Sequence, residues 1–247
     1  KYLLDKLLVI ALKKKEKSFV FYYNIYCYFK KYKIKAQYKN QKYYVVDNLK
    51  TWQVYPLERF KFYVNGLKHR GDQLFNEYLL KNINFNDDDI IIDCGANNGD
   101  LYLCFDKKIK YYGIEPSPIV FSNLQNNVKN QNLINKGLWK KQQKEINFYL
   151  LDESGDSSIF EMKHYTKKIT IETITLDSLI DRINKKIKLI KLEAEGSEPE
   201  ILEGLSINLN LVEFITIDAG FERGLSQEQT LVPCLNYLTK NNFELID

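Results

Sequence analysis

The chain has 247 residues, enough for one large domain or for one domain with an appendage, and it can bury most of its apolar surface on folding. Hydrophobic residues make up 45% of it and charged residues 28%, which excludes a disordered chain and a fibrous repeat. The formal net charge of +4 comes from lysines spread along the sequence, without a dense basic stripe, so no nucleic-acid partner is expected.

The four cysteines indicate a reducing compartment. Cys27, Cys94, Cys104 and Cys234 form no C-x-x-C pair and lie in apolar or strand-like stretches, where a free cysteine behaves as a small hydrophobic residue. The longest apolar run near the start, residues 7–12, is too short for a membrane span or a signal-peptide core. We therefore expect a cytoplasmic protein with no transmembrane segment in the printed sequence.

Residues 1–82 are predicted to form a small α+β extension. Apolar residues recur at helical spacing over residues 3–11, before the basic run at residues 13–15. This pattern predicts an amphipathic helix that packs on its own domain or on a partner subunit, and a helix lying on an anionic membrane is the alternative. The following segments are predicted to be a buried element at 19–29, a β-hairpin at 33–38 and 41–46, chain breaks at Gly66 and Gly71, and a short helix at 73–81.

Residues 83–247 predict a doubly wound α/β domain with a mostly parallel sheet. Short apolar runs alternate there with helical segments, which is typical of βαβ units. The predicted strands are residues 90–94, 111–115, 133–138, 188–193, 214–218 and 243–246. The predicted helices are residues 100–106, 118–130, 176–182, 198–205 and 226–241. Residues 145–173 predict antiparallel strands inserted between the third and fourth strands of the sheet.

The first predicted strand leads into a glycine-containing turn. Asp93 ends the apolar run and is followed by Gly95 and Gly99 in G-x-x-x-G spacing, not in the G-x-G-x-x-G spacing of dinucleotide-binding proteins. Ligands of open α/β sheets bind at the carboxyl ends of the strands, where glycines let the backbone approach them. The turn therefore predicts a ligand site and disfavours NAD.

A second acidic residue closes the next strand. Glu115 precedes Pro116, and a carboxylate at this strand end can accept both ribose hydroxyls of an adenosine ligand. Leu138, after the third strand, is then expected beside the adenine.

A third acidic cluster lies at the end of the fourth strand. Alternation with a period of two places Lys191, Glu193 and Glu195 on one side, and a strand buried on both faces does not carry such charges without a purpose. These residues are assigned to the mouth of an active site. Ser197 and Glu200 have the spacing of a capping box for the next helix.

Four segments in this order resemble the FkbM family of methyltransferases: residues 91–97, 114–116, 175–179 and 190–198. The family usually has Asp where this chain has Glu193. The resemblance implies a class I, Rossmann-like methyltransferase fold, S-adenosylmethionine as cofactor, and, in most members, methylation of sugar or natural-product hydroxyls. The expected partner is a small-molecule or glycan acceptor, including nucleotide-linked sugars. The predicted cofactor-binding residues are Asp93, Gly95, Asn97, Asn98, Gly99, Glu115, Pro116 and Leu138.

Methylation of a hydroxyl needs a base or a metal that makes the hydroxyl more acidic. The predicted catalytic residues are Lys191, Glu193, Glu195 and Asp218, of which Glu193 and Asp218 could instead hold Mg²⁺ or Mn²⁺. Arg70, Arg223 and His164 are predicted to bind the acceptor. Two alternative functions stay open: a methyltransferase acting on RNA or protein, and a non-catalytic scaffold with the same fold. A second copy of the chain, in a homo-oligomer, is a further candidate partner.

Overall fold

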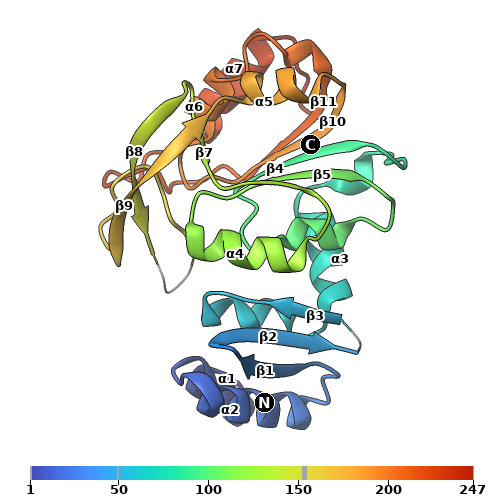
Figure 1. Ribbon diagram of the computed structural model, residues 1–247, viewed down its shortest axis with the longest axis vertical. Helices are drawn as coiled ribbons and strands as arrows, with labels where there is room; N and C mark the ends of the chain where they lie inside the picture. Colours follow the sequence, from blue (N-terminus) through green and yellow to red (C-terminus); the bar gives the residue numbers. More distant parts are fainter. Residues whose placement is uncertain (1, 49, 152–154, 247) are drawn as a thin grey trace.

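A five-stranded parallel sheet organises the larger, C-terminal part of the chain (Figure 1). The computed structural model describes residues 2–48, 50–151 and 155–246. The strand order is β11-β10-β4-β5-β6, so the chain leaves the central strand β4 in one direction and later returns to its other side. This is a doubly wound arrangement and confirms the predicted α/β class with a parallel sheet. The strands are β4 (Ile90–Cys94), β5 (Lys110–Ile114), β6 (Asn132–Ile134), β10 (Ile187–Leu192) and β11 (Val212–Ile217).

Helices cover both faces of this sheet. Ile91 points into one apolar core, while its neighbours Ile90 and Ile92 point into the other, as the alternation of side chains along a strand requires. The first core is closed by η3 (Asp100–Cys104) and α4 (Pro118–Asn127). The second is closed by α5 (Leu176–Ile183), α6 (Glu198–Glu203), η4 (Leu209–Leu211) and α7 (Leu231–Lys240).

A second sheet is inserted between β6 and α5. It has the order β7-β9-β8, where β8 and β9 are antiparallel and β7 runs parallel to β9. Its side chains Phe148, Leu150 and Ile171 form a small core of their own. The strands are β7 (Gly137–Leu138), β8 (Gln143–Leu150) and β9 (Lys167–Ile174).

The N-terminal region forms a layer of its own at one end of the molecule (Figure 1). Its antiparallel sheet contains the predicted hairpin, with Asn40 and Gln41 at positive φ in the two-residue turn, and one further strand. Phe19 of the second helix packs against Phe60, which lies in the segment that follows this sheet, and the centroids of the two rings are 4.7 Å apart. The elements are α1 (Tyr2–Leu12), α2 (Glu16–Lys30), β1 (Lys35–Lys39), β2 (Lys42–Asp47), β3 (Lys50–Gln53), η1 (Leu57–Tyr63), α3 (Leu67–Glu77) and η2 (Leu80–Asn82).

One apolar core runs across the predicted domain boundary at residue 82. Tyr63 and Leu80 are fully buried in the same core as Ile91 and Tyr111 of the parallel sheet. The N-terminal region is therefore packed directly beneath the strands that carry the site. None of the helices in the described ranges is both long enough and apolar enough to cross a bilayer.

Several predicted elements differ from the structure. The predicted buried element at residues 19–29 is buried on one face only, because Phe21 and Phe29 of α2 are exposed, and the helix predicted at residues 73–81 is observed as α3, which ends at Glu77. Residues 133–138 are not one strand, because Asn135 turns away to donate hydrogen bonds to the carbonyls of Glu115 and Pro116, and the chain changes sheets there. Gly71 does not break the chain but lies within α3, where a Cβ would come within 2.3 Å of the Leu103 carbonyl oxygen. The last predicted strand, at residues 243–246, is absent from the described part of the chain, because the Phe243 N–H caps α7 through the Leu238 carbonyl.

Candidate active site

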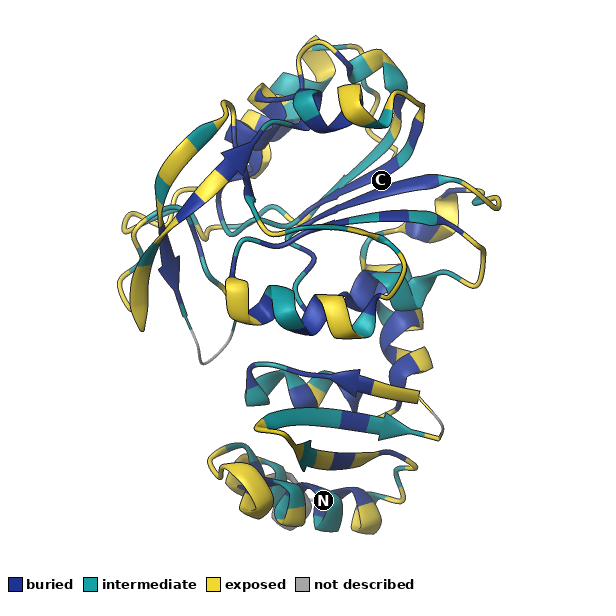
Figure 2. Cartoon of the chain, viewed as in Figure 1, coloured by how far each residue is buried: buried dark blue, intermediate teal, exposed yellow. Residues whose placement is uncertain are grey.

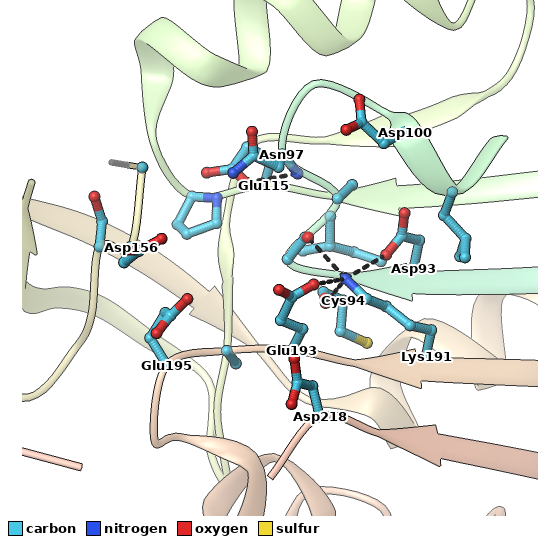
Figure 3. A pocket seen from close by; sticks show the side chains of 18 of the residues that line it. Asp93, Cys94, Asn97, Asp100, Glu115, Asp156, Lys191, Glu193, Glu195 and Asp218 are labelled. Carbon is cyan, nitrogen blue, oxygen red and sulfur yellow. Dashed lines mark hydrogen bonds and ion pairs between the residues drawn. The ribbon is translucent and has the colours of Figure 1, made fainter. Parts of the chain in front are cut away.

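One cavity of about 640 Å³ lies at the carboxyl ends of the parallel strands (Figure 3), a size that suits a small-molecule ligand. It is closed by the N-terminal region on one side and by the inserted sheet on the other. The predicted site residues that line it are Arg70, Asp93, Gly95, Asn97, Glu115, Pro116, Leu138, Lys191, Glu193, Glu195 and Asp218. Those that do not line it are Asn98, Gly99, His164 and Arg223.

Gly95 and Gly99 are needed for packing within the protein. Both have positive φ, and a Cβ on Gly95 would lie 1.9 Å from the carbonyl oxygen of Glu193. A Cβ on Gly99 would lie 2.5 Å from Val128, which follows α4. The first glycine therefore lets the turn after β4 touch the loop after β10, and the second lets α4 approach.

Asn97 and Asn98 have different positions. Asn97, at φ 48°, lines the cavity, and its side chain accepts a hydrogen bond from the Asn98 N–H. Asn98 is fully buried and exchanges hydrogen bonds with the backbone of Tyr55, at 2.9 and 3.3 Å. It therefore anchors the segment after β3, outside the cavity.

Glu115 presents a buried carboxylate to the cavity. Its two oxygens accept hydrogen bonds from the backbone N–H groups of Asn97 at 3.0 Å and Ser117 at 2.8 Å. Burial raises the pKa of Glu115 to about 7, against the lowering effect of these two hydrogen bonds. Each oxygen keeps a second lone pair, so the carboxylate can still accept hydroxyl groups of a ligand.

Lys191 connects two neighbouring strand ends. Its ammonium lies 3.1 Å from the carboxylate of Asp93 in β4 and 2.8 Å from that of Glu193 after β10, and it donates to the Gly95 carbonyl at 3.1 Å. Tyr78 adds a 2.5 Å hydrogen bond to the same Glu193 oxygen, and Tyr111 donates to Asp93. Burial opposes the charge of Lys191, but the two carboxylates raise its pKa well above the usual value. Glu193, which burial alone would make less acidic, has its pKa lowered to about 2 by Lys191.

Glu195 lies in the acidic part of the cavity. Its side chain is near Asp156 of the inserted segment in Figure 3, and its backbone carbonyl accepts a hydrogen bond from Ser158 at 2.7 Å. Burial, followed by the charges of Asp156 and Glu193, raises the pKa of Glu195 to about 9. This carboxyl group is protonated at neutral pH and would ionise beside a positively charged ligand.

Asp218 follows β11 and lines the same cavity from an exposed position. Among the described residues its carboxylate has no hydrogen-bond or ion-pair partner, whereas Glu193 has both. Partial desolvation of its carboxylate in the cavity, followed by the neighbouring charge of Glu193, raises the pKa of Asp218. Of the two carboxylates, Asp218 is therefore the better proton acceptor.

The N-terminal region contributes cavity residues that the sequence analysis missed. Arg59 and Lys61 of η1 and Tyr78 after α3 line the cavity, and Arg59 lies 3.2 Å from Asp100. The sequence signal that could have indicated these residues is the presence of charged side chains within the aromatic segment at residues 58–63. The sequence alone, however, does not show that this segment packs against the parallel sheet.

Asp100 fixes this region and explains the position of Arg70. It is buried and accepts hydrogen bonds from Arg59 and Arg70 at 3.2 Å each and from Tyr63 at 2.5 Å. Burial would raise the pKa of Asp100, but the two guanidinium groups lower it. Arg70 lines the cavity, but its Nε already donates to Asp100, whereas the Nε of Arg59 has no hydrogen-bond partner among the described residues; Arg70 is therefore the poorer candidate for binding a phosphate.

Arg223 and the predicted capping box also need correction. Arg223 forms a two-pronged ion pair with Glu200, at 2.6 and 2.7 Å, and its guanidinium lies 4.1 Å from the Phe160 ring. Ser197 makes no capping hydrogen bond, and Glu200, the other residue of the predicted capping box, instead binds Arg223. Arg223 therefore stabilises the loop after β10, while His164 is an exposed residue of the inserted segment.

The carboxylates of the cavity form no metal-binding cluster of three or more ligands among the described residues. In residues 2–48, 50–151 and 155–246, no three metal-ligating side chains come together. Glu193 is also bound to an ammonium group, which would repel a cation. The described residues therefore give no support to the predicted Mg²⁺ or Mn²⁺ site.

The doubly wound sheet and the cavity at its switch point define an α/β protein of the class that binds a ligand at the carboxyl ends of its strands. Within this class, the family model described as the methyltransferase FkbM domain matches residues 93–245. The chain belongs to this family and carries a methyltransferase domain, as the resemblance predicted. A search of curated proteins gives no match to the chain.

Substituting Gly95 with Ala should destabilise the fold. An alanine held at the positive φ of this position is strained, which costs about 1–3 kcal/mol. Its Cβ would in addition clash with the carbonyl oxygen of Glu193. Gly224→Ala is the matched control, because Gly224 also has positive φ but an added Cβ would make only ordinary van der Waals contacts, the nearest at 3.8 Å from the Phe160 side chain. Thermal unfolding should show the larger loss for Gly95→Ala, and equal losses would show that the Glu193 contact is unimportant.

Substituting Lys191 with Met should cost about 3–5 kcal/mol of stability, because it leaves two carboxylates without their common counter-ion. Lys188→Met is the control on the same strand. Lys188 pairs at 2.6 Å with Glu213, whose side chain is largely exposed, so its loss should cost less than about 1 kcal/mol. Denaturant unfolding of both variants measures the difference, and similar small losses would contradict the role of Lys191.

Proposed function

We propose that this protein is an S-adenosylmethionine-dependent O-methyltransferase that methylates a hydroxyl of a sugar or nucleotide-linked sugar in glycan or polysaccharide biosynthesis. Family membership gives the reaction class. The free cysteines, of which Cys27, Cys94 and Cys234 are buried, agree with a cytoplasmic location.

The observation that carries the proposal is the pairing of two kinds of acidic group in one cavity. Glu115 offers lone pairs suited to a ribose diol, and Glu195 with Asp156 forms an acidic wall suited to a cation. S-adenosylmethionine has both features, an adenosine ribose and a positively charged sulfonium with an ammonium group. When bound, it supplies an activated methyl group for transfer to a nucleophile.

The residues of the chain then have separate roles. Glu115, Asn97 and the turn at Gly95 hold the nucleoside part, with Leu138 beside the base. Lys191 fixes Glu193 as an ionised group that orients the acceptor but binds protons weakly. Asp218 takes the proton from the acceptor hydroxyl.

The positive charge in the cavity favours an anionic acceptor such as a nucleotide-linked sugar. Arg59 and Lys61 line the cavity, and the buried Nε of Arg59 has no hydrogen-bond partner in the described residues. A phosphate oxygen would satisfy that donor. We assign to Arg59 the role that the sequence analysis gave to Arg70 and Arg223.

Substituting Glu115 with Gln should weaken S-adenosylmethionine binding by about 10- to 100-fold, the scale of losing charge-assisted hydrogen bonds. In the wild type, affinity should fall as the pH drops below about 7, because protonation removes the acceptor charge of Glu115. The variant should lose this pH dependence. Calorimetric titration across pH measures both effects.

Glu198→Gln is the matched control, because Glu198 also accepts backbone hydrogen bonds, from Ala194 and Gly196, but does not line the cavity. It should affect stability more than affinity. An unchanged dissociation constant in folded Glu115→Gln would move the ribose site elsewhere. A wild type that does not bind S-adenosylmethionine would leave the scaffold alternative.

Substituting Asp218 with Asn should lower kcat by about 10²-fold or more, the usual range for loss of a general base, while cofactor affinity changes only a few-fold. The acidic limb of the wild-type pH–rate profile should disappear with it, because Asp218 must be ionised to act. Glu222→Gln is the control, since Glu222 also has a raised pKa but does not line the cavity. Activity that requires a divalent cation after EDTA treatment, or full turnover by Asp218→Asn, would contradict this assignment.

A further inference from the structure

The outer face of α2 exposes large apolar side chains to solvent. Phe21, Tyr28 and Phe29 have relative exposures of 60%, 78% and 59%, although aromatic residues are usually well buried. Figure 2 shows exposed positions on this helix pair at the end of the molecule. Isolated exposed apolar residues need no explanation, but a contiguous group marks an interaction surface.

These side chains are contiguous. They line one shallow groove on α2, formed by Lys17, Val20, Phe21, Asn24, Ile25, Tyr28 and Phe29. The opposite face of the helix is fully used, because Phe19, Tyr23, Tyr26 and Cys27 are buried in the core. A helix that is apolar on both sides is normally covered on both sides, so the outer face requires a partner.

The charge around this face identifies the partner. Residues 1–35 contain ten lysines and two acidic residues, a net charge of +8, whereas the whole chain carries +4. The rest of the chain therefore carries −4. The lysines occur all along the sequence, but the net positive charge is concentrated in residues 1–35. Lys13, Lys14, Lys15 and Lys17 are exposed at the start of α2, and Lys31 and Lys33 are exposed just beyond its end.

We infer that the outer face of α2 docks on an anionic lipid surface. Aromatic side chains enter the boundary between head groups and acyl chains, while lysines at both ends of the helix bind the lipid charge. A second copy of the chain is a worse fit, because a symmetric contact would bring two faces with this positive charge together. Nucleic acid is also a worse fit, because residues 1–35 contain no arginine and the exposed set includes the aliphatic Val9 and Ile10 of α1.

This surface is separate from the cavity. It lies on the far side of the β1–β3 sheet from α4 and the parallel strands (Figure 1). Docking therefore needs no change in the site and no spanning helix. A methyltransferase held this way would meet acceptors at a membrane surface, but the inference stands on α2 alone and does not depend on the proposed reaction.

The test is co-sedimentation of the full chain with vesicles of phosphatidylcholine alone or mixed with phosphatidylglycerol. We expect binding only to the mixed vesicles, with a strength that falls as salt is raised. Replacing Lys13, Lys14 and Lys15 with Gln should weaken binding by about fivefold for each lysine. Phe21→Ser combined with Phe29→Ser should weaken it by at least about tenfold.

Matched controls separate this surface from general stickiness. Ile207→Ser removes an equally exposed apolar residue elsewhere, and Lys107→Gln with Lys108→Gln removes exposed charge elsewhere, so both should bind as the wild type does. The substituted side chains on α2 are exposed, so circular dichroism should show intact folds. Absence of binding, equal binding to neutral vesicles, a dimer lost in the Phe21/Phe29 variant, or tighter binding to an RNA oligonucleotide would each overturn the inference.

Discussion

The buried ammonium of Lys191 is the interaction on which the site depends. It lies between the two halves of the parallel sheet and neutralises Asp93 on one strand and Glu193 on its neighbour. Without it, two carboxylates at adjacent strand ends would repel each other in a low-dielectric environment. The same group binds the Gly95 carbonyl, so the electrostatics and the shape of the first turn are fixed together.

The N-terminal region is part of this arrangement. Asp100 accepts hydrogen bonds from Arg59, Arg70 and Tyr63 of that region. Tyr78, from the same region, donates a hydrogen bond to Glu193. The cavity is therefore built by two segments that are far apart in the sequence. Its acidic side comes mainly from strand ends and its basic side mainly from the N-terminal region.

The sequence predicted what depends on local pattern. β4 was predictable because continuous apolar residues indicate a strand buried on both faces, and Glu115 and Glu193 were predictable because carboxylates at such strand ends meet at one edge. Arg59 was not predictable, because its role comes from packing between distant segments. The capping box was wrong: Ser197 makes no capping bond, and Glu200 binds Arg223, which lies 23 residues away and which a local pattern does not reveal.

The high pKa of Glu195 links ligand occupancy to proton exchange with the solvent. At neutral pH this carboxyl group holds a proton, and a cation placed beside it would favour the ionised form. Occupation of the cavity by a positively charged molecule would then expel a proton, and departure of that charge would take one up. The empty cavity is then closer to electrical neutrality than its number of carboxyl groups implies. Because binding of the cation releases a proton, binding is also tighter in alkaline than in acidic solution.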